Sequence, residues 1–170
     1  MRTWCGRSRV TDGWVVDTSP VIALGRIQCL DLLPGMGSSV LIPEAVLCEL
    51  EAGLTKEPGR KAILAWARAF RVRDAPIATS VAGWDLGAGE SQVIALCLSD
   101  RSRRCVLDDG EARRCALSLG VPMTGTLGIL LRAKRMGMVP RVRPLIERLA
   151  VSGYYLDRPL IERVLERAGE

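Results

Sequence analysis

The residues WVVDTSPVIAL, 14–24, set a pattern that the rest of the chain repeats. A short apolar run at 14–16 leads directly into an acid, Asp17. Ser19 and Pro20 then supply a capping residue followed by proline at the first helical position, and the apolar residues beyond them continue as a helix. A short apolar strand that passes straight into a helix is typical of α/β proteins.

The same alternation of short strands and helices continues to the end of the chain. Strands are predicted at 14–17, 38–43, 71–75, 105–107, 121–125 and 154–156. Helices are predicted at 19–33, 43–51, 61–70, 87–98, 111–119, 126–136, 142–150 and 159–168. This order predicts a parallel sheet that helices cover on both faces. No repeat or linker divides it, so we expect an N-terminal extension, 1–13, and a single domain, 14–170, that includes the C-terminal helices.

The composition excludes several kinds of chemistry. The 170 residues carry a net charge of +5 and contain no histidine, which excludes Ser–His–Asp and Cys–His nucleophiles and His-ligated zinc. The six cysteines form no C-x-x-C pair, so we expect reduced thiols in a cytoplasmic protein. No uninterrupted apolar stretch reaches the roughly 20 residues of a membrane span, and no membrane association is expected.

Acids stand at the ends of the predicted strands. Asp17 ends the first strand, and Asp108 and Asp109 end the strand at 105–107. Glu90 opens the helix before that strand, and Glu49 lies in the helix after the second strand. The carboxyl ends of parallel strands share one rim, where α/β proteins bind ligands. Clustered carboxylates favour a cation, and oxygen ligands suit Mg²⁺ or Mn²⁺, which can activate water for phosphodiester hydrolysis without histidine.

Each acid also has a purely structural interpretation. Asp17 can cap the helix that follows it, Glu49 can be a solvated helix residue, and Glu90 can interact with a helix dipole. Asp108-Asp109-Gly110 is also a common turn sequence. The sequence pattern alone therefore leaves both a metal site and a set of caps open.

Five ordered segments resemble the PIN-domain family, over about residues 14–155. They are VVDTSPVIAL, IPEAVLCEL, GAGESQVIALCLS, VLDDGEARRCALSLGV and TGTLGILLRAK. The chain is most similar to a prokaryotic branch that carries GE, DD and GTLG motifs. The resemblance implies a three-layer α/β/α fold with a central, mainly parallel sheet. It also implies a Mg²⁺- or Mn²⁺-dependent ribonuclease, like the VapC-type toxins that pair with antitoxins.

The resemblance also implies roles for the acids. Asp17, Glu49, Glu90 and Asp109 correspond to the catalytic acids. Asp17, Glu90 and Asp109 are the expected metal ligands, and Asp108 is an adjacent candidate for the position of Asp109. Glu90 stands where the common pattern has aspartate, so its carboxylate is on a longer arm.

The sequence also suggests residues for substrate and partner contacts. Arg113 and Arg114 follow the acidic rim and can contact phosphates, and the hydroxyls of Thr18 and Thr126 can reach the same rim. An aromatic content of only 4% argues against a stacking platform for single strands. The terminal helix has one apolar face, which predicts packing on the same domain or a dimer seam, and PIN-like proteins commonly dimerise.

The preferred interpretation is a cytoplasmic metal-dependent ribonuclease with an RNA substrate. A toxin role beside an antitoxin protein and a homodimeric state follow from the resemblance. The alternative is a non-catalytic PIN-like binding or regulatory module with a residual acidic metal pocket.

Overall fold

The computed structural model describes residues 13–36, 39–53 and 59–170. Their strands form one sheet in the order β3-β2-β1-β4-β5, and every neighbouring pair is parallel. The strands are β1 (Gly13–Val16), β2 (Val40–Pro43), β3 (Arg71–Val72), β4 (Arg103–Val106) and β5 (Met123–Thr124). Gly13, which was predicted to end an N-terminal extension, is the first residue of β1. The rest of that extension, 1–12, lies outside the described residues.

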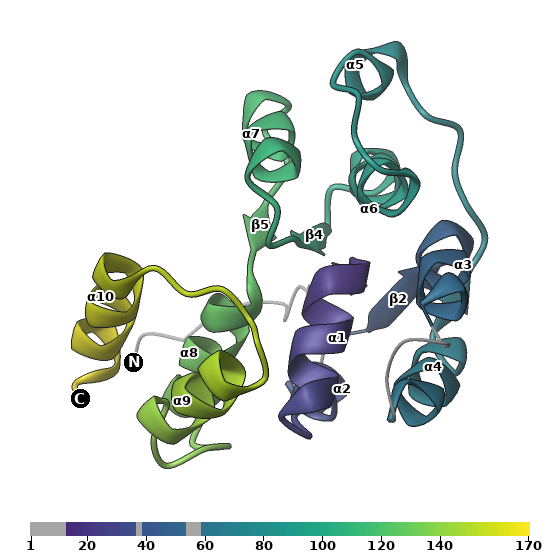
Figure 1. Ribbon diagram of the computed structural model, residues 1–170. Coiled ribbons are helices and arrows are strands. Elements are labelled where there is room, and N and C mark those ends of the chain that lie inside the picture. The colour runs from purple at the N-terminus through teal and green to yellow at the C-terminus, as the bar shows by residue number, and fades with distance from the viewer. Residues whose placement is uncertain (1–12, 37–38, 54–58) are drawn as a thin grey trace, which may run out of the picture.

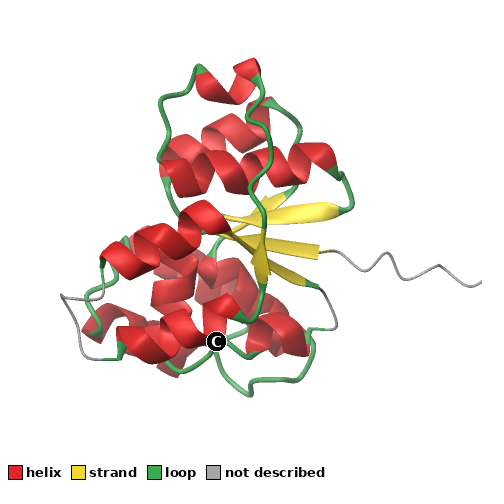
Figure 2. Cartoon of the chain, turned by 90° about the vertical axis from the view of Figure 1, so that its right-hand side faces the viewer, coloured by secondary structure: helices red, strands yellow, loops and turns green. Residues whose placement is uncertain are grey.

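Helices cover both faces of the sheet and confirm the three-layer α/β/α architecture (Figure 2). They are α1 (Thr18–Arg26), α2 (Leu32–Gly35), α3 (Glu44–Ala52), α4 (Arg60–Arg68), α5 (Thr79–Ala82), α6 (Ala88–Ser99), α7 (Gly110–Ser118), α8 (Thr126–Arg135), α9 (Arg143–Val151) and α10 (Arg158–Ala168). In Figure 1, α6 and α7 lie on one side of the sheet, and α1, α8 and α9 lie on the other. None of the described helices is long and apolar enough to cross a membrane.

The strand order reverses between β1 and β4. The chain moves from β1 outward to β2 and β3, and then returns through α5 and α6 to add β4 and β5 on the other side of β1. Val16 is paired with Val106, so the two strands end side by side. In open parallel sheets, the crevice at such a reversal is where ligands bind.

Continuous apolar residues build the centre of the sheet. Trp14, Val15 and Val16 are at most 1% exposed, because both faces of a parallel strand are covered. Helix α6 is buried along most of its length, from Gly89 to Cys97. Three free cysteines, Cys97, Cys105 and Cys115, are buried in this core.

Two predictions about the first helix were wrong. The helix begins at Thr18 with Asp17 as its cap, so Pro20 is its third residue rather than its first. It was also predicted to continue to residue 33, but α1 ends at Arg26. Gln28 adopts φ 57°, the Cys29 N–H donates to the Leu24 carbonyl at 2.8 Å, and the Gln28 N–H donates to the Gly25 carbonyl at 3.0 Å. This is a Schellman end built on glutamine instead of the usual glycine.

The predicted strand at 154–156 is also wrong. Gly153 adopts φ 82°, and the Tyr154 N–H donates to the Leu149 carbonyl at 3.1 Å to close α9. The three residues then form an irregular segment that leads into α10. Helix α10 packs against α8, and Val164 and Leu165 are buried, as expected for a terminal helix that packs on its own domain.

Candidate functional site

Asp17 lies at the reversal point of the sheet. Its N–H donates to the Val106 carbonyl at 3.1 Å, which carries the β1–β4 pairing one residue beyond the strands. Its side chain is 2% exposed, and Oδ2 accepts a hydrogen bond from the Ser19 N–H at 3.4 Å. Oδ1 has no hydrogen-bond partner among the residues that the structure describes.

Burial raises the pKa of the Asp17 carboxyl to about 7, against an ordinary value of 3.8. The negative charges of Glu49 and Glu90 contribute to this rise in pKa, while backbone hydrogen bonds from Thr18 and Ser19 oppose it. A buried carboxylate with one unpaired oxygen is costly for a protein to keep. The position therefore favours a proton or a cation beside Asp17.

Glu49 connects the starts of two helices to the middle of a third. It projects from α3, where Oε1 accepts a hydrogen bond from the Gly89 N–H at 2.8 Å and Oε2 accepts one from the Thr18 hydroxyl. A Cβ atom at Gly89 would lie 2.8 Å from Glu49 Oε2, so a larger residue there would displace the Glu49 carboxylate. Thr18, which was predicted to contact substrate, is engaged in holding Glu49.

Glu90 and Asp109 stand at two further helix starts. Glu90 Oε2 accepts a hydrogen bond from the Gly87 N–H at 3.0 Å, at the entrance to α6. Asp109 Oδ1 accepts one from the Ala112 N–H at 2.9 Å and caps α7. Burial raises the pKa of Glu90, and the nearby charges of Asp109 and Glu49 raise it further.

Asp17 therefore interacts electrostatically with Glu49 and Glu90, and Glu90 interacts in turn with Asp109; we call these four residues the acidic cluster. As they stand, no three carboxylates or thiols in the described ranges form a group that could ligate one ion. The donor set nevertheless fits Mg²⁺ or Mn²⁺, because it consists of hard oxygen atoms. The orphaned Oδ1 of Asp17 supports that fit, since it is a buried acceptor that lacks a partner.

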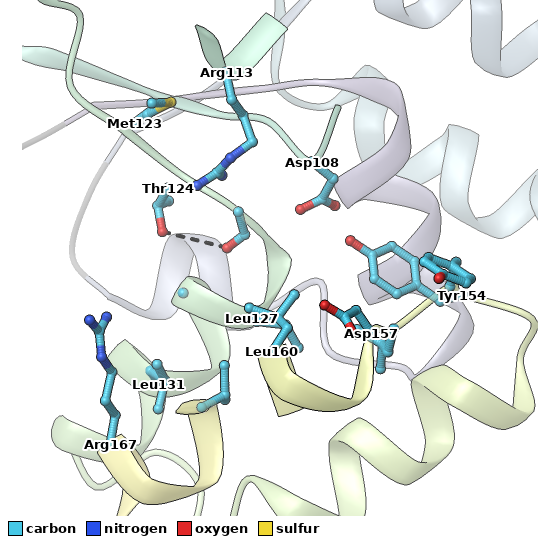
Figure 3. A pocket seen from close by; sticks show the side chains of 15 residues that line it. Asp108, Arg113, Met123, Thr124, Leu127, Leu131, Tyr154, Asp157, Leu160 and Arg167 are labelled. Atoms are coloured by element: carbon cyan, nitrogen blue, oxygen red, sulfur yellow. Dashed lines mark hydrogen bonds between the residues drawn. The ribbon is translucent and has the colours of Figure 1, made fainter. Parts of the chain in front are cut away.

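The adjacent residue Asp108 is directed elsewhere. Its Oδ1 accepts from the Thr126 N–H at 2.8 Å, and its Oδ2 accepts from the Thr126 hydroxyl at 2.6 Å, at the start of α8. Thr126 is fully buried, although it was predicted to contact substrate. Burial raises the pKa of Tyr154, and so does its interaction with Asp108, toward which its hydroxyl points in Figure 3.

The two candidate arginines also differ. Arg113 donates from Nη1 to the Leu107 carbonyl at 2.9 Å, which holds it beside Asp108. Arg114 forms an exposed ion pair with Glu111 on the same helix. Only Arg113 of this pair is held by a contact at the rim of the sheet.

Two features of the site were not predicted from the sequence. Gly89 was not recognised as a contact of Glu49, although the glycines on either side of Ala88 signal a close approach of backbone. Tyr154 was assigned to a strand, although Gly153 before it is a common helix end.

A comparison with protein families gives one match. A family model described as PIN domain covers residues 13–170, which include all the described strands and helices. No curated protein matches the chain.

Proposed function

The chain belongs to the PIN-domain family, whose members are in general nucleases that use divalent metal ions, and on this premise we propose that it is a Mg²⁺- or Mn²⁺-dependent ribonuclease. One observation carries the proposal. Asp17 is a buried carboxylate at the reversal point of the sheet, with Oδ1 unpaired among the described residues and the negative charges of Glu49 and Glu90 close enough to raise its pKa. A divalent cation would satisfy that oxygen and neutralise the repulsion within the acidic cluster.

The roles of the acids follow from their hydrogen bonds. Asp17, Glu90 and Asp109 would hold the ion, because each keeps at least one carboxylate oxygen free of the helix-start hydrogen bonds described above. Glu49 would orient the cluster, because both of its oxygens accept hydrogen bonds from other segments. We place Asp108 outside the ligand set, since both of its oxygens are bonded to Thr126.

The chemistry requires no histidine. A bound divalent ion supplies an acidified water and charge stabilisation for the hydrolysis of a phosphodiester. Asp17 would keep its charge once the ion is present, and the hydrogen bonds of Glu49 would fix the geometry around it. Arg113 is anchored to the Leu107 carbonyl at the end of β4, and we assign it to a substrate phosphate.

The direct test is Mn²⁺ binding by titration calorimetry. We expect saturable binding by the wild-type protein and its loss in Asp17→Asn, with circular dichroism showing that the variant stays folded. Glu147→Gln, which removes an exposed charge from α9, is the matched control and should bind as the wild type does. In Mn²⁺, the wild-type protein and Glu147→Gln should cleave a mixed-sequence RNA, and Asp17→Asn should not. An absence of Mn²⁺ binding by the wild-type protein would overturn the proposal.

A toxin role in the cytoplasm beside an antitoxin is the narrower proposal. It rests on the resemblance of VVDTSP, the GE and DD motifs and GTLG to VapC-type proteins. Expression should arrest growth, and Asp17→Asn should relieve the arrest at equal protein level. Normal growth with soluble wild-type protein would contradict a toxin role while leaving the nuclease proposal in place.

A non-catalytic module is the alternative, and one observation favours it. Glu49, Glu90 and Asp109 all accept hydrogen bonds from helix-start N–H groups, as caps would in the absence of any ion. This alternative expects no metal-dependent cleavage of RNA, whether or not the acidic pocket binds Mn²⁺. The cleavage assay therefore separates the two proposals.

A further inference from the structure

Asp108, which directly precedes Asp109 of the acidic cluster, lines a cavity of about 550 Å³ (Figure 3). The end of β5 and helix α8 form one wall, and the segment before α10 together with α10 itself forms the other. Its apolar lining is Met123, Leu127, Leu131, Leu156, Leu160 and Val164. A volume of this size is ordinary for a small-ligand site.

We infer that this cavity binds an unpaired base of the RNA strand next to the phosphate that is cleaved; the inference rests on the ribonuclease function proposed above. The first argument is continuity with the acidic cluster. Asp109 belongs to the cluster and caps α7, whereas Asp108, the preceding residue, forms part of the cavity wall. The cluster and the cavity therefore meet at two consecutive residues of the chain.

The second argument is the aromatic character of the cavity. Both tyrosines of the chain, Tyr154 and Tyr155, line it, although aromatic residues make up only 4% of the sequence. The hydroxyl of Tyr154 is tied to Asp108, while Tyr155 is 90% exposed. Exposed aromatic rings beside a phosphate-binding groove stack with unpaired bases.

The third argument is the placement of charged groups. Asp157 precedes the first residue of α10, yet its carboxylate accepts no capping hydrogen bond, and it lies between Tyr154 and Leu127 in Figure 3. It is therefore available to accept a hydrogen bond from the exocyclic amine of a base. Carboxylates recognise the N4 amine of cytosine in this way, and uracil has no such amine. Arg167 also lines the cavity and can contact a flanking phosphate.

The test is binding of fluorescein-labelled single-stranded rC10 and rU10, measured by anisotropy in EDTA so that no cleavage occurs. The wild-type protein should bind rC10 about fivefold more tightly than rU10. Asp157→Asn should abolish this preference. Tyr155→Phe should bind within about twofold of the wild type and Tyr155→Leu about tenfold more weakly, because stacking needs the ring and not only apolar area.

Arg167→Gln should weaken both oligonucleotides and lower the salt slope by about one. Arg163→Gln removes the same charge from the same helix outside the cavity lining and is the matched control. Equal binding by Tyr155→Leu and Tyr155→Phe, or equal affinity for rC10 and rU10 in the wild type, would overturn the inference. Equal binding by the two tyrosine variants would indicate a purely apolar cavity, such as one that accepts a side chain of a protein partner.

Mn²⁺ calorimetry on the same preparations keeps this inference separate from the ribonuclease proposal. If the wild-type protein binds Mn²⁺ and cleaves RNA while the cavity variants bind RNA as it does, the cavity inference fails alone. If it binds Mn²⁺ in no preparation but discriminates rC10 from rU10 through Asp157, the nuclease proposal fails and the cavity is a base site without cleavage. If it binds neither Mn²⁺ nor RNA, both fail.

Discussion

Replacement of Asp17 by asparagine should stabilise the protein at neutral pH when no divalent ion is present. The carboxyl is 2% exposed, and its pKa is raised from an ordinary 3.8 to about 7. Because the folded state binds this proton more tightly than the unfolded state does, the stabilisation is complete below pH 3.8 and is lost as the pH rises through 7. Asparagine keeps the shape of the side chain and removes the titration.

The size of the effect follows from the pKa shift. A shift from 3.8 to about 7 corresponds to about 4 kcal/mol between the two limits. About 2.5 kcal/mol of that change falls between pH 5 and pH 8. The wild-type protein should therefore lose about 2.5 kcal/mol of unfolding free energy relative to Asp17→Asn over this range.

Urea unfolding of both proteins in EDTA, at four pH values from 5 to 8, measures this difference. Glu147→Gln on α9 serves as the control for the loss of an exposed charge, and its difference from the wild type should not change with pH. Adding Mn²⁺ at pH 7.5 should raise the stability of the wild-type protein and leave Asp17→Asn unchanged, since only a site that binds the ion is stabilised by it. A difference between the wild type and Asp17→Asn that stays constant from pH 5 to pH 8 would refute the reasoning from burial.

Other substitutions separate the roles of the neighbouring acids. Asp109→Asn should weaken Mn²⁺ binding at least tenfold by calorimetry. Asp108→Asn should change Mn²⁺ affinity less than about threefold but lower the free energy of unfolding by about 1–2 kcal/mol. A larger loss of Mn²⁺ affinity in Asp108→Asn than in Asp109→Asn would exchange the two assignments. Glu90→Gln should keep its helix-start hydrogen bond and a stability within about 0.5 kcal/mol of the wild type, yet lose Mn²⁺ affinity; unchanged affinity would remove this residue from the ligand set. Gly89→Ala should lower the free energy of unfolding, measured in urea, by about 1 kcal/mol or more, because the new methyl group contacts Glu49. At an open helix position the same substitution would raise this free energy by about 1 kcal/mol. A net gain in stability would show that the Glu49 carboxylate moves freely.

Much of the fold and the position of the acidic rim follow from local sequence patterns. The apolar run at 14–16 followed by an acid predicted a buried strand of a parallel sheet, and the structure shows such a strand at Gly13–Val16. The same reasoning predicted that Glu49 and Glu90 lie near Asp17, and both raise its pKa; Asp109 raises the pKa of Glu90. Periodicity and strand-end position were sufficient to predict the rim on which these residues lie, because that rim is set by the helix or strand that carries each residue.

The rest depends on contacts between distant segments. Asp108 and Asp109 are equivalent in a sequence pattern, and the start of α8, 18 residues after Asp108, decides which of them turns away from the cluster. Tyr154 has a high β-propensity, but the turn at Gly153 leaves it with no strand partner, so tertiary context overrides propensity. For the same reason, the low aromatic content concealed that both tyrosines meet at one cavity.

The order of the strands also determines when the cluster can exist during synthesis. Its acids come from residues 17, 49, 90 and 109, and the last of them reaches its place only when β4 joins β1 at the centre of the sheet. A nascent chain that ends before β4 therefore has an incomplete set of carboxylates and no neighbour for one edge of β1. For a ribonuclease, this timing would keep a partly synthesised chain inactive toward the messenger that is still being translated.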